Sequence, residues 1–164
     1  PASLDLVLYE TGSLEPVIRE ALEAARQLES ALAEERGALE QRDAAALDET
    51  AARKQEHLGR LETLDGRRRR LLAEHGYPAD RGGVEALLAD CPSEHPLTGL
   101  WQSLGELAGR CRDANAANGA IVHLRQRQIA RALDVLRGVP ETAAPVYGAD
   151  GSSGRPDGRA FGSA

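Results

Sequence analysis

The sequence predicts an all-α protein, an elongated antiparallel bundle of about three long helices with a short connector helix and a flexible C-terminal tail. Three observations support this prediction. The first 137 residues are rich in leucine, alanine, glutamate and arginine, which favour helices. Apolar residues in this part recur at steps of four and three, the spacing of one helical face. The last 27 residues hold six glycines and three prolines, so we expect a helical bundle domain over residues 1–137 and a flexible tail over 138–164.

The first long helix is expected from Leu14 to Leu39. Ser13 is a candidate N-cap, and Pro16 then falls in the first turn, where proline is tolerated. The residues of its apolar face are Leu14, Ile18, Ala21, Ala25, Leu28, Leu32 and Leu39. The pattern leaves open whether residues 3–12 extend this helix or form a separate turn.

The second long helix is expected between an N-cap at Asp43 and a stop at Gly76. The short link before it predicts that the first two helices are antiparallel neighbours. Its apolar residues are Leu47, Ala51, Leu58, Leu61, Leu64, Leu71 and Leu72. Lys54 and Arg68 interrupt this face, and we expect their charges to reach water. Residues 77–96 are expected to form a connector with about two helical turns.

The longest helix is expected from Leu97 to Arg137, and its 41 residues would span about 60 Å. Its predicted apolar stripe is Leu97, Trp101, Leu104, Ala108, Cys111, Asn115, Asn118, Val122, Arg125, Ile129, Ala132 and Leu136. Two interpretations of the polar seam at Asn115 and Asn118 remain open. Either these amides form hydrogen bonds inside the bundle and fix its register, or they mark where the helix leaves the core and becomes a binding arm.

Charge and composition disfavour several classes of function. A net charge of -6 and a pI near 5.3 disfavour nucleic-acid binding through the overall field. Cys91, Cys111 and the four histidines lack the spacing of a metal site. We therefore expect no cofactor and no enzymatic activity. The absence of a long apolar run or a signal-peptide pattern predicts a cytoplasmic protein without membrane insertion.

Three further groups of residues contain side chains that are typical of functional sites, and a functional role is disfavoured for each. The carboxylates of Glu34, Glu35 and Glu40 are expected to be solvated on a charged helix face. The basic run Arg67–Arg70 has two interpretations: its charges complement the dipole near the end of the second helix, which is the favoured one, or they form a site for an acidic partner. His57 would suit a phosphotransfer domain, but the small residues and the lysine that such a site requires are missing around it.

Three short motifs follow one another in the second half of the chain, at Asn115–Gly119, Gln128–Leu136 and Tyr147–Gly151. In order and spacing they resemble the FlgN family of flagellar export chaperones. Asn115–Gly119 resembles the family's Asn-x-x-Asn-Gly element. Gln128–Leu136 is similar to the segment that follows that element, and Tyr147–Gly151 resembles the family's C-terminal signature.

The resemblance implies a cytosolic, substrate-specific chaperone of type III export. Members of the family bind the hook-filament junction proteins FlgK and FlgL, prevent their premature association and deliver them to the export gate protein FlhA. By that likeness the tail residues Tyr147, Gly148, Asp150 and Gly151 are expected to dock on FlhA. The cargo-binding residues are expected on the C-terminal half of the longest helix. They are Asn118, Ile121, Val122, Leu124, Arg125, Gln128, Ile129, Ala132, Leu133 and Leu136.

An alternative from another class is a structural coiled-coil or bundle protein. In this alternative the longest helix packs on its own copy and the tail is a linker. A dimer of this kind would bury Ile129 between the two copies.

Overall fold

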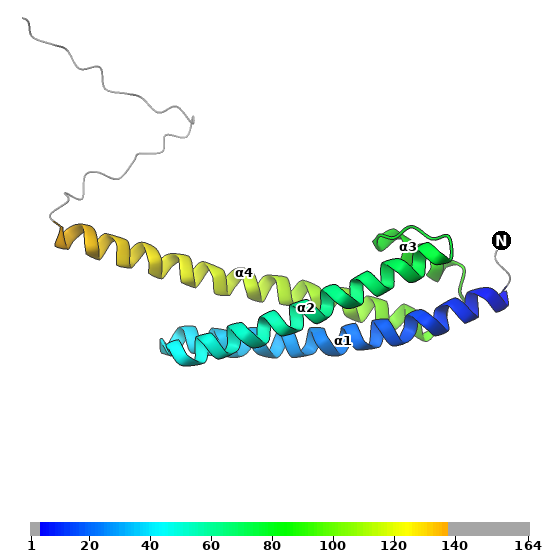
Figure 1. Ribbon diagram of the computed structural model, residues 1–164, viewed down its shortest axis with the longest axis horizontal. Helices are drawn as coiled ribbons and strands as arrows, with labels where there is room; N and C mark the ends of the chain where they lie inside the picture. Colours follow the sequence, from blue (N-terminus) through cyan, green and yellow to red (C-terminus); the bar gives the residue numbers. More distant parts are fainter. Residues whose placement is uncertain (1–3, 138–164) are drawn as a thin grey trace, which may run out of the picture. The chain divides into compact units, whose positions relative to one another are not determined.

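The computed structural model describes residues 4–137, with side chains from Ser13 onward, and this part contains four helices and no strand (Figure 1). They are α1 (Leu4–Gln41), α2 (Ala44–Glu74), α3 (Arg81–Ala89) and α4 (Pro96–Leu136). The predicted all-α fold of three long helices and one short connector helix is confirmed. Packing divides the chain after Leu124, within α4, so the residues up to Leu124 and those from Arg125 are described separately.

The sequence pattern left open whether the residues before Leu14 extend the first long helix, and in the structure they do, as part of α1. It begins at Leu4 and is continuous through Pro16, so the predicted N-cap at Ser13 is wrong. Pro16 has no N–H to donate to the carbonyl of Gly12 one turn earlier, which costs the helix one hydrogen bond. The residues around it compensate through burial, because Leu14, Val17 and Ile18 are almost completely enclosed.

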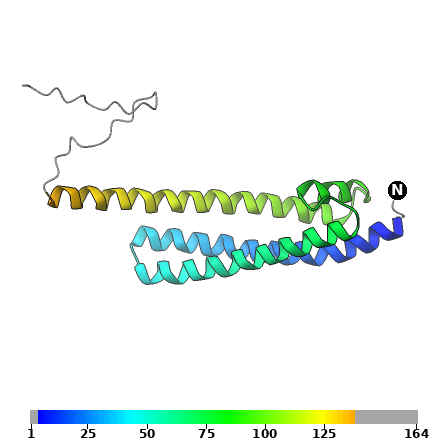
Figure 2. The ribbon, with the colours of Figure 1, turned by 45° about the horizontal axis from the view of Figure 1, so that its top comes forward.

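The predicted apolar face of α1 is confirmed, since all seven of its residues are buried. The buried face is wider than predicted and also includes Val17, Leu22, Ala24, Ala31 and Ala38. The reason is that α1 packs on two helices at once. Its side chains form clusters with Leu64 and Leu72 of α2 and with Leu97 and Leu107 of α4. Figures 1 and 2 show α1 and α2 side by side along their lengths.

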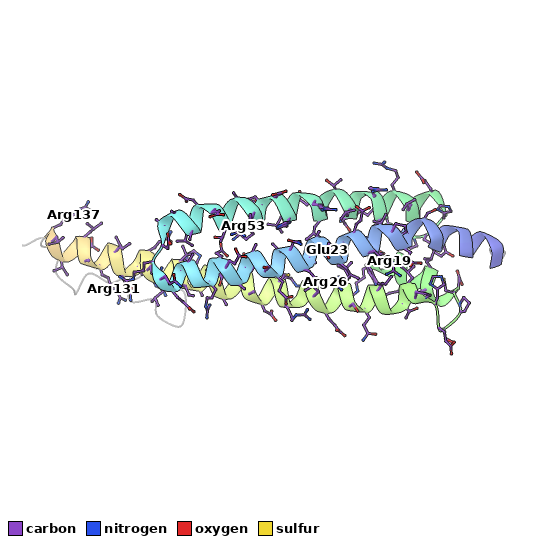
Figure 3. All side chains as sticks on the ribbon, turned by 90° about the horizontal axis from the view of Figure 1, so that it is seen from below. Arg19, Glu23, Arg26, Arg53, Arg131 and Arg137 are labelled. Atoms are coloured by element: carbon purple, nitrogen blue, oxygen red, sulfur yellow. The ribbon has the colours of Figure 1, made fainter. Side chains whose placement is uncertain are left out.

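The link between α1 and α2 is as short as predicted. The side chain of Asp43 accepts a hydrogen bond from the backbone N–H of Ala46 at 3.0 Å, which confirms Asp43 as the N-cap of α2. Arg42 turns the chain with a positive φ of 57°. This tight turn makes the two helices antiparallel, and ion pairs such as Arg53–Glu34 connect them. Figure 3 shows Arg53 on α2, beside α1.

Gly76 stops helix α2 just after Glu74, as predicted, through a pair of backbone hydrogen bonds. The N–H of Tyr77 donates to the carbonyl of Leu72 at 2.9 Å, and that of Gly76 donates to Ala73 at 3.2 Å. This is the Schellman pattern, which requires a left-handed residue, and Gly76 has a φ of 80°. The pattern turns the chain sharply away from α2 into the connector.

The connector contains α3, the two helical turns expected there. Asp80 is its N-cap and accepts a hydrogen bond from the N–H of Gly83 at 3.2 Å. Glycine is required at position 83, because a Cβ there would lie 1.7 Å from the carbonyl oxygen of Pro78. This close approach lets Val84 and Leu87 pack into the core beside Leu72.

The charge of Arg68 does not reach water, contrary to the prediction. The residue is 8% exposed, and its guanidinium donates to Asp65 at 2.7 Å and to the carbonyl of Asp80 at 3.1 Å. It also lies 5.7 Å from the ring centre of Trp101 in α4. The favoured interpretation of the run Arg67–Arg70 is wrong as well, because α2 continues to Glu74 and its last turn contains no basic residue. Arg68 instead ties α2 to the connector and to α4.

Candidate functional site

The inward face of α4, up to Leu124, is rotated slightly from the predicted stripe. Leu97, Leu107, Cys111 and Asn118 are its buried residues. Leu107 replaces Ala108 as the deeply buried position, and the predicted stripe residue Asn115 is exposed. The predicted positions Leu97, Leu104, Cys111 and Asn118 all face inward. Of the predicted positions between them, Trp101 is half-buried, as is its neighbour Leu100, and from Ala108 onward the more buried residue lies one position earlier than predicted.

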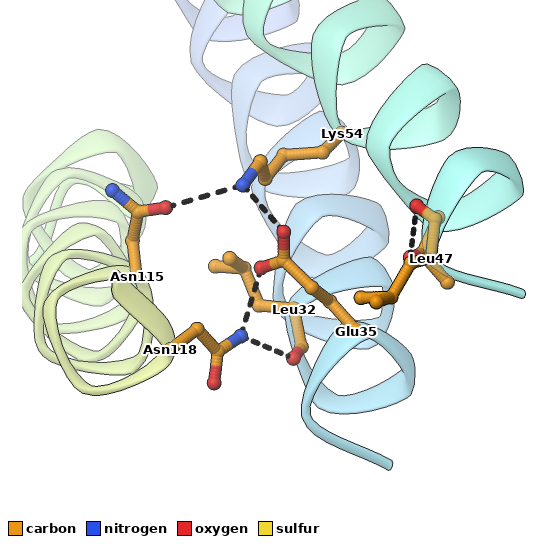
Figure 4. Close-up of polar contacts among 7 residues, drawn as sticks. Leu32, Glu35, Leu47, Lys54, Asn115 and Asn118 are labelled. Atoms are coloured by element: carbon orange, nitrogen blue, oxygen red, sulfur yellow. Dashed lines mark hydrogen bonds and ion pairs between the residues drawn. The ribbon is translucent and has the colours of Figure 1, made fainter. Parts of the chain in front are cut away.

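A polar network joins three helices at the middle of α4 (Figure 4). Asn118 is 4% exposed, and its Nδ2 donates to the carbonyl of Leu32 at 2.9 Å and to Oε2 of Glu35 at 2.8 Å. The other oxygen of Glu35 accepts a charge-assisted bond from Nζ of Lys54 at 2.7 Å. Lys54 also reaches Oδ1 of Asn115 at 3.5 Å. Residues of α1, α2 and α4 thus satisfy one another in a partly buried site.

The network corrects two predictions and bears on a third. The carboxylate of Glu35 is not solvated, because its side chain is 12% exposed and accepts from both neighbouring helices. The charge of Lys54 is directed to Glu35 instead of to water. Asn118 has the geometry of the first interpretation of the seam, a buried amide that fixes register. We therefore leave it out of the cargo surface proposed below.

About two turns before Asn118, Arg110 and Cys111 hold α4 against α1. Arg110 donates to Oε1 of Glu29 at 2.7 Å, and this bond together with the charge of Glu29 holds the pKa of Arg110 above its ordinary value. The Cys111 thiol lies 3.6 Å from the carbonyl of Ala25, and burial raises the pKa of Cys111, with Glu29 adding to the effect and Arg110 opposing it. A protonated, enclosed thiol packs as a small apolar group.

The turns of α4 from Arg125 onward carry large apolar side chains that are exposed. Ile129 is 61% exposed and Leu136 is 82% exposed. Leu133 is exposed too, as are the smaller or polar residues Ala132 and Gln128. All of these belong to the predicted cargo surface, which did not include Val135, a residue that is 66% exposed.

Four more of the predicted cargo residues lie between positions 121 and 125 of α4. Val122 and Leu124, the last residues of α4 before the division, are exposed, and Ile121 is half-buried. Arg125 is half-buried at the start of the following turns.

An apolar cleft among α1, α2, α3 and the first half of α4 was not predicted. Its volume is about 710 Å³, and Ile18, Leu64, Trp101 and Leu104 are among its lining residues. A smaller cleft of about 220 Å³ follows it along α1 and reaches Asn115. Periodicity could not show these clefts, because they depend on how closely α2 and α4 approach each other.

The predicted docking residues Tyr147, Gly148, Asp150 and Gly151 lie outside the described residues, as does the whole predicted tail. Within the described side chains, no group of histidine, cysteine, aspartate and glutamate residues gathers where it could hold a metal ion. None of the helices over residues 4–137 has an apolar stretch long enough to cross a membrane.

A helical bundle with a long helix whose last turns expose an amphipathic surface has the features of a protein that binds other helices. The family model described as FlgN protein matches residues 11–155. The match covers most of the chain, which therefore belongs to the FlgN family of flagellar export chaperones. Comparisons with curated proteins and with solved structures found no significant match.

Proposed function

We propose that this chain is a cytosolic chaperone for the hook-filament junction proteins FlgK and FlgL, which it keeps from associating prematurely and delivers to the export gate protein FlhA. The observation that carries the proposal is the exposure of Ile129, Leu133 and Leu136 within one short stretch of helix. In our proposal this stretch covers a terminal amphipathic helix of the cargo.

The spacing of these side chains suits a helical partner. Ile129, Leu133 and Leu136 are separated by four and three residues, so they lie along one side of the helix and can pack against the apolar side of another. Each exposed aliphatic side chain that a partner covers contributes about 1.5–3 kcal/mol when burial is complete. A few such contacts support binding that is specific and still reversible during export.

Self-association through the same stretch remains the alternative function. It would bury Ile129 and Leu133 of one copy against those of another. Sedimentation analysis over a range of protein concentrations separates the two: a stable dimer that dissociates on Ile129→Asp supports the structural role, and a monomer supports the chaperone.

Calorimetric titration with a peptide of the C-terminal helical segment of FlgK tests the proposal. We expect saturable binding with a negative heat-capacity change, the mark of apolar burial. Ile129→Asp should abolish this binding and change the free energy of unfolding by no more than about 0.5 kcal/mol, as expected at a surface position.

The matched control for this titration is Leu58→Asp. Leu58 is an exposed leucine of α2 that lines the smaller cleft. Binding should survive this change. Loss of binding in Leu58→Asp with normal binding in Ile129→Asp would contradict the proposed surface and favour the cleft.

For Tyr147 we propose a separate role in docking on FlhA. Tyr147→Ala is expected to leave the cargo titration unchanged, because the proposed cargo surface lies on α4, and to reduce binding to the purified cytoplasmic domain of FlhA. Pull-down of that domain by the cargo-loaded chaperone measures the second effect. Loss of cargo binding in this variant would show that the two roles are not divided in this way.

A further inference from the structure

The exposed turns at the end of α4 are basic, although the chain as a whole has a net charge of -6. Between residues 125 and 137 there are four arginines and one acidic residue, Asp134. Arg131 and Arg137 project from different sides of these turns in Figure 3. The apolar surface of this stretch therefore lies within a locally positive field.

Ile129 and Leu133 form a short row of exposed apolar side chains, which we call the apolar row. Two of the arginines lie at its ends. Arg125, Ile129 and Leu133 follow one another at steps of four along one side of α4. Arg137 follows at the same step, directly after the last helical residue, and its backbone N–H donates to the carbonyl of Leu133 at 3.0 Å. At 1.5 Å per residue, the two arginines lie about 18 Å apart along the axis. The apolar row is thus bounded by positive charge at both ends.

The remaining charges lie on the other side of the helix. With about 100° of rotation per residue, Arg127, Arg131 and Asp134 fall close together and point away from Ile129. That side therefore carries charges of both signs. The side with the apolar row carries positive charge alone.

We propose that the helix which binds this stretch carries an acidic residue near each end of its apolar stripe, about three turns apart, so that its carboxylates meet Arg125 and Arg137. This inference rests on the proposed function and specifies the class of cargo segment that the site selects. Apolar contacts would supply most of the affinity, while the charge pairs would set the position of the cargo helix along the row and raise the association rate.

Both arginines can donate hydrogen bonds to a carboxylate of the cargo helix. Arg137 is exposed. Arg125 is half-buried and already interacts with a neighbour, but a guanidinium has five N–H donors and can serve more than one acceptor.

The charges of Arg125 and Arg137 and the net charge of the chain disfavour two other partners for this surface. A second copy of this chain would bring arginine against arginine in either orientation, because both ends of the row are positive, and this costs free energy. An anionic membrane also attracts basic amphipathic helices, but the net charge of -6 of the whole chain opposes approach to an anionic surface.

The test is titration of the FlgK C-terminal peptide into the full chain and into Arg125→Glu/Arg137→Glu, at low and at high salt. We expect the double variant to bind at least about tenfold more weakly at low salt, with the difference reduced at high salt. A peptide whose acidic residues are replaced by lysine should bind the double variant more tightly than it binds the unchanged chain. Arg125→Gln/Arg137→Gln, which removes charge without reversing it, repeats the test if the first variant loses helix content.

The matched control is Arg127→Glu/Arg131→Glu, the same change of charge in the same turns but on the opposite side of the helix. Both arginines are exposed. The affinity of this variant should stay within about twofold of the unchanged chain at high salt and fall less than that of the test variant at low salt. Equal weakening in both double variants would overturn the inference, because the effect would then come from net charge alone.

Three other outcomes are distinguishable. If Ile129→Asp abolishes binding and the Arg125/Arg137 variants do not weaken it, the proposed function stands and the inference is wrong. If the peptide binds none of these proteins, the proposed function fails and the inference fails with it. Binding of the full chain to phosphatidylglycerol vesicles, lost in the Arg125/Arg137 variants while peptide binding is unchanged, would assign these arginines to a membrane surface and overturn the inference.

Discussion

Leu107→Asp is expected to abolish the folded bundle at room temperature. Leu107 is 3% exposed and packs among Leu28 and Leu32 of α1 and Cys111 of its own helix. Removing a buried leucine side chain costs about 2–5 kcal/mol, and the unpaired carboxylate adds a further penalty. The sum approaches the whole stability of a small domain, about 5–15 kcal/mol.

Urea unfolding followed by circular dichroism measures this effect, with Leu133→Asp as the control. The control makes the same chemical change in the same helix at a side chain that is 44% exposed. We expect its free energy of unfolding to stay within about 0.5 kcal/mol of the unchanged protein. Similar losses in both variants would mean that the outer turns of α4 are as well packed as the inner ones, contrary to the exposure of Leu133.

The second large effect is expected from Asn118→Asp. The new carboxylate would stand where Nδ2 of Asn118 now lies, 2.8 Å from Oε2 of Glu35. Two like charges in a partly buried site replace a hydrogen bond, so we expect a loss of about 3 kcal/mol or more at neutral pH. Asn118→Leu removes the same hydrogen bonds without adding a charge and should cost only about 1 kcal/mol.

The loss of folding stability in Asn118→Asp should grow as the pH rises. The neighbouring carboxylate of Glu35 would raise the folded-state pKa of the introduced carboxyl above its unfolded value of about 3.9. The folded variant then binds a proton that the unfolded chain releases, so its stability falls as pH rises through that interval. Thermal unfolding of both variants and the unchanged chain from acid to neutral pH checks this. A loss in Asn118→Asp that equals that of Asn118→Leu at every pH would show that the network does not bury the site.

Most of the fold could be predicted from local patterns. Asp43 and Gly76 act through hydrogen bonds to residues a few positions away, so the ends of α2 follow from the sequence alone. The start of α1 could not be predicted in the same way. A serine followed by a proline three residues later has the pattern of a helix start, and only the burial of Leu14, Val17 and Ile18 outweighs it.

Periodicity alone could not predict which residues of α4 face the core. Leu100, Leu107 and Ile121 are as apolar as their neighbours Trp101, Ala108 and Val122, so a step of three and a step of four fit the sequence equally well. Only packing against α1 selects Leu107 as the buried position. At the first of these pairs neither residue is selected, since Leu100 and Trp101 are both half-buried against the core and Trp101 lies beside the guanidinium of Arg68.

The exposed apolar surface at the end of α4 could be predicted from the sequence, while the polar network around Asn118 could not. Exposed apolar residues near the end of α4 follow from an amphipathic pattern that continues to Leu136 in the longest helix of the chain. The polar network was hidden, because Glu35 looks like an ordinary surface charge and Lys54, although it interrupts an apolar face, belongs to a different helix. Their pairing with Asn118 arises only when three helices meet at one level.

Hydrogen–deuterium exchange on the full chain, with and without the FlgK C-terminal peptide, tests most directly where cargo binds. We expect the peptide to slow amide exchange over residues 125–136 and to leave the rest of the described chain nearly unchanged, because only that stretch gains a partner. Slower exchange around Leu61–Leu64 and Trp101–Leu104, with no change over 125–136, would place the cargo in the apolar cleft and contradict the proposed cargo surface.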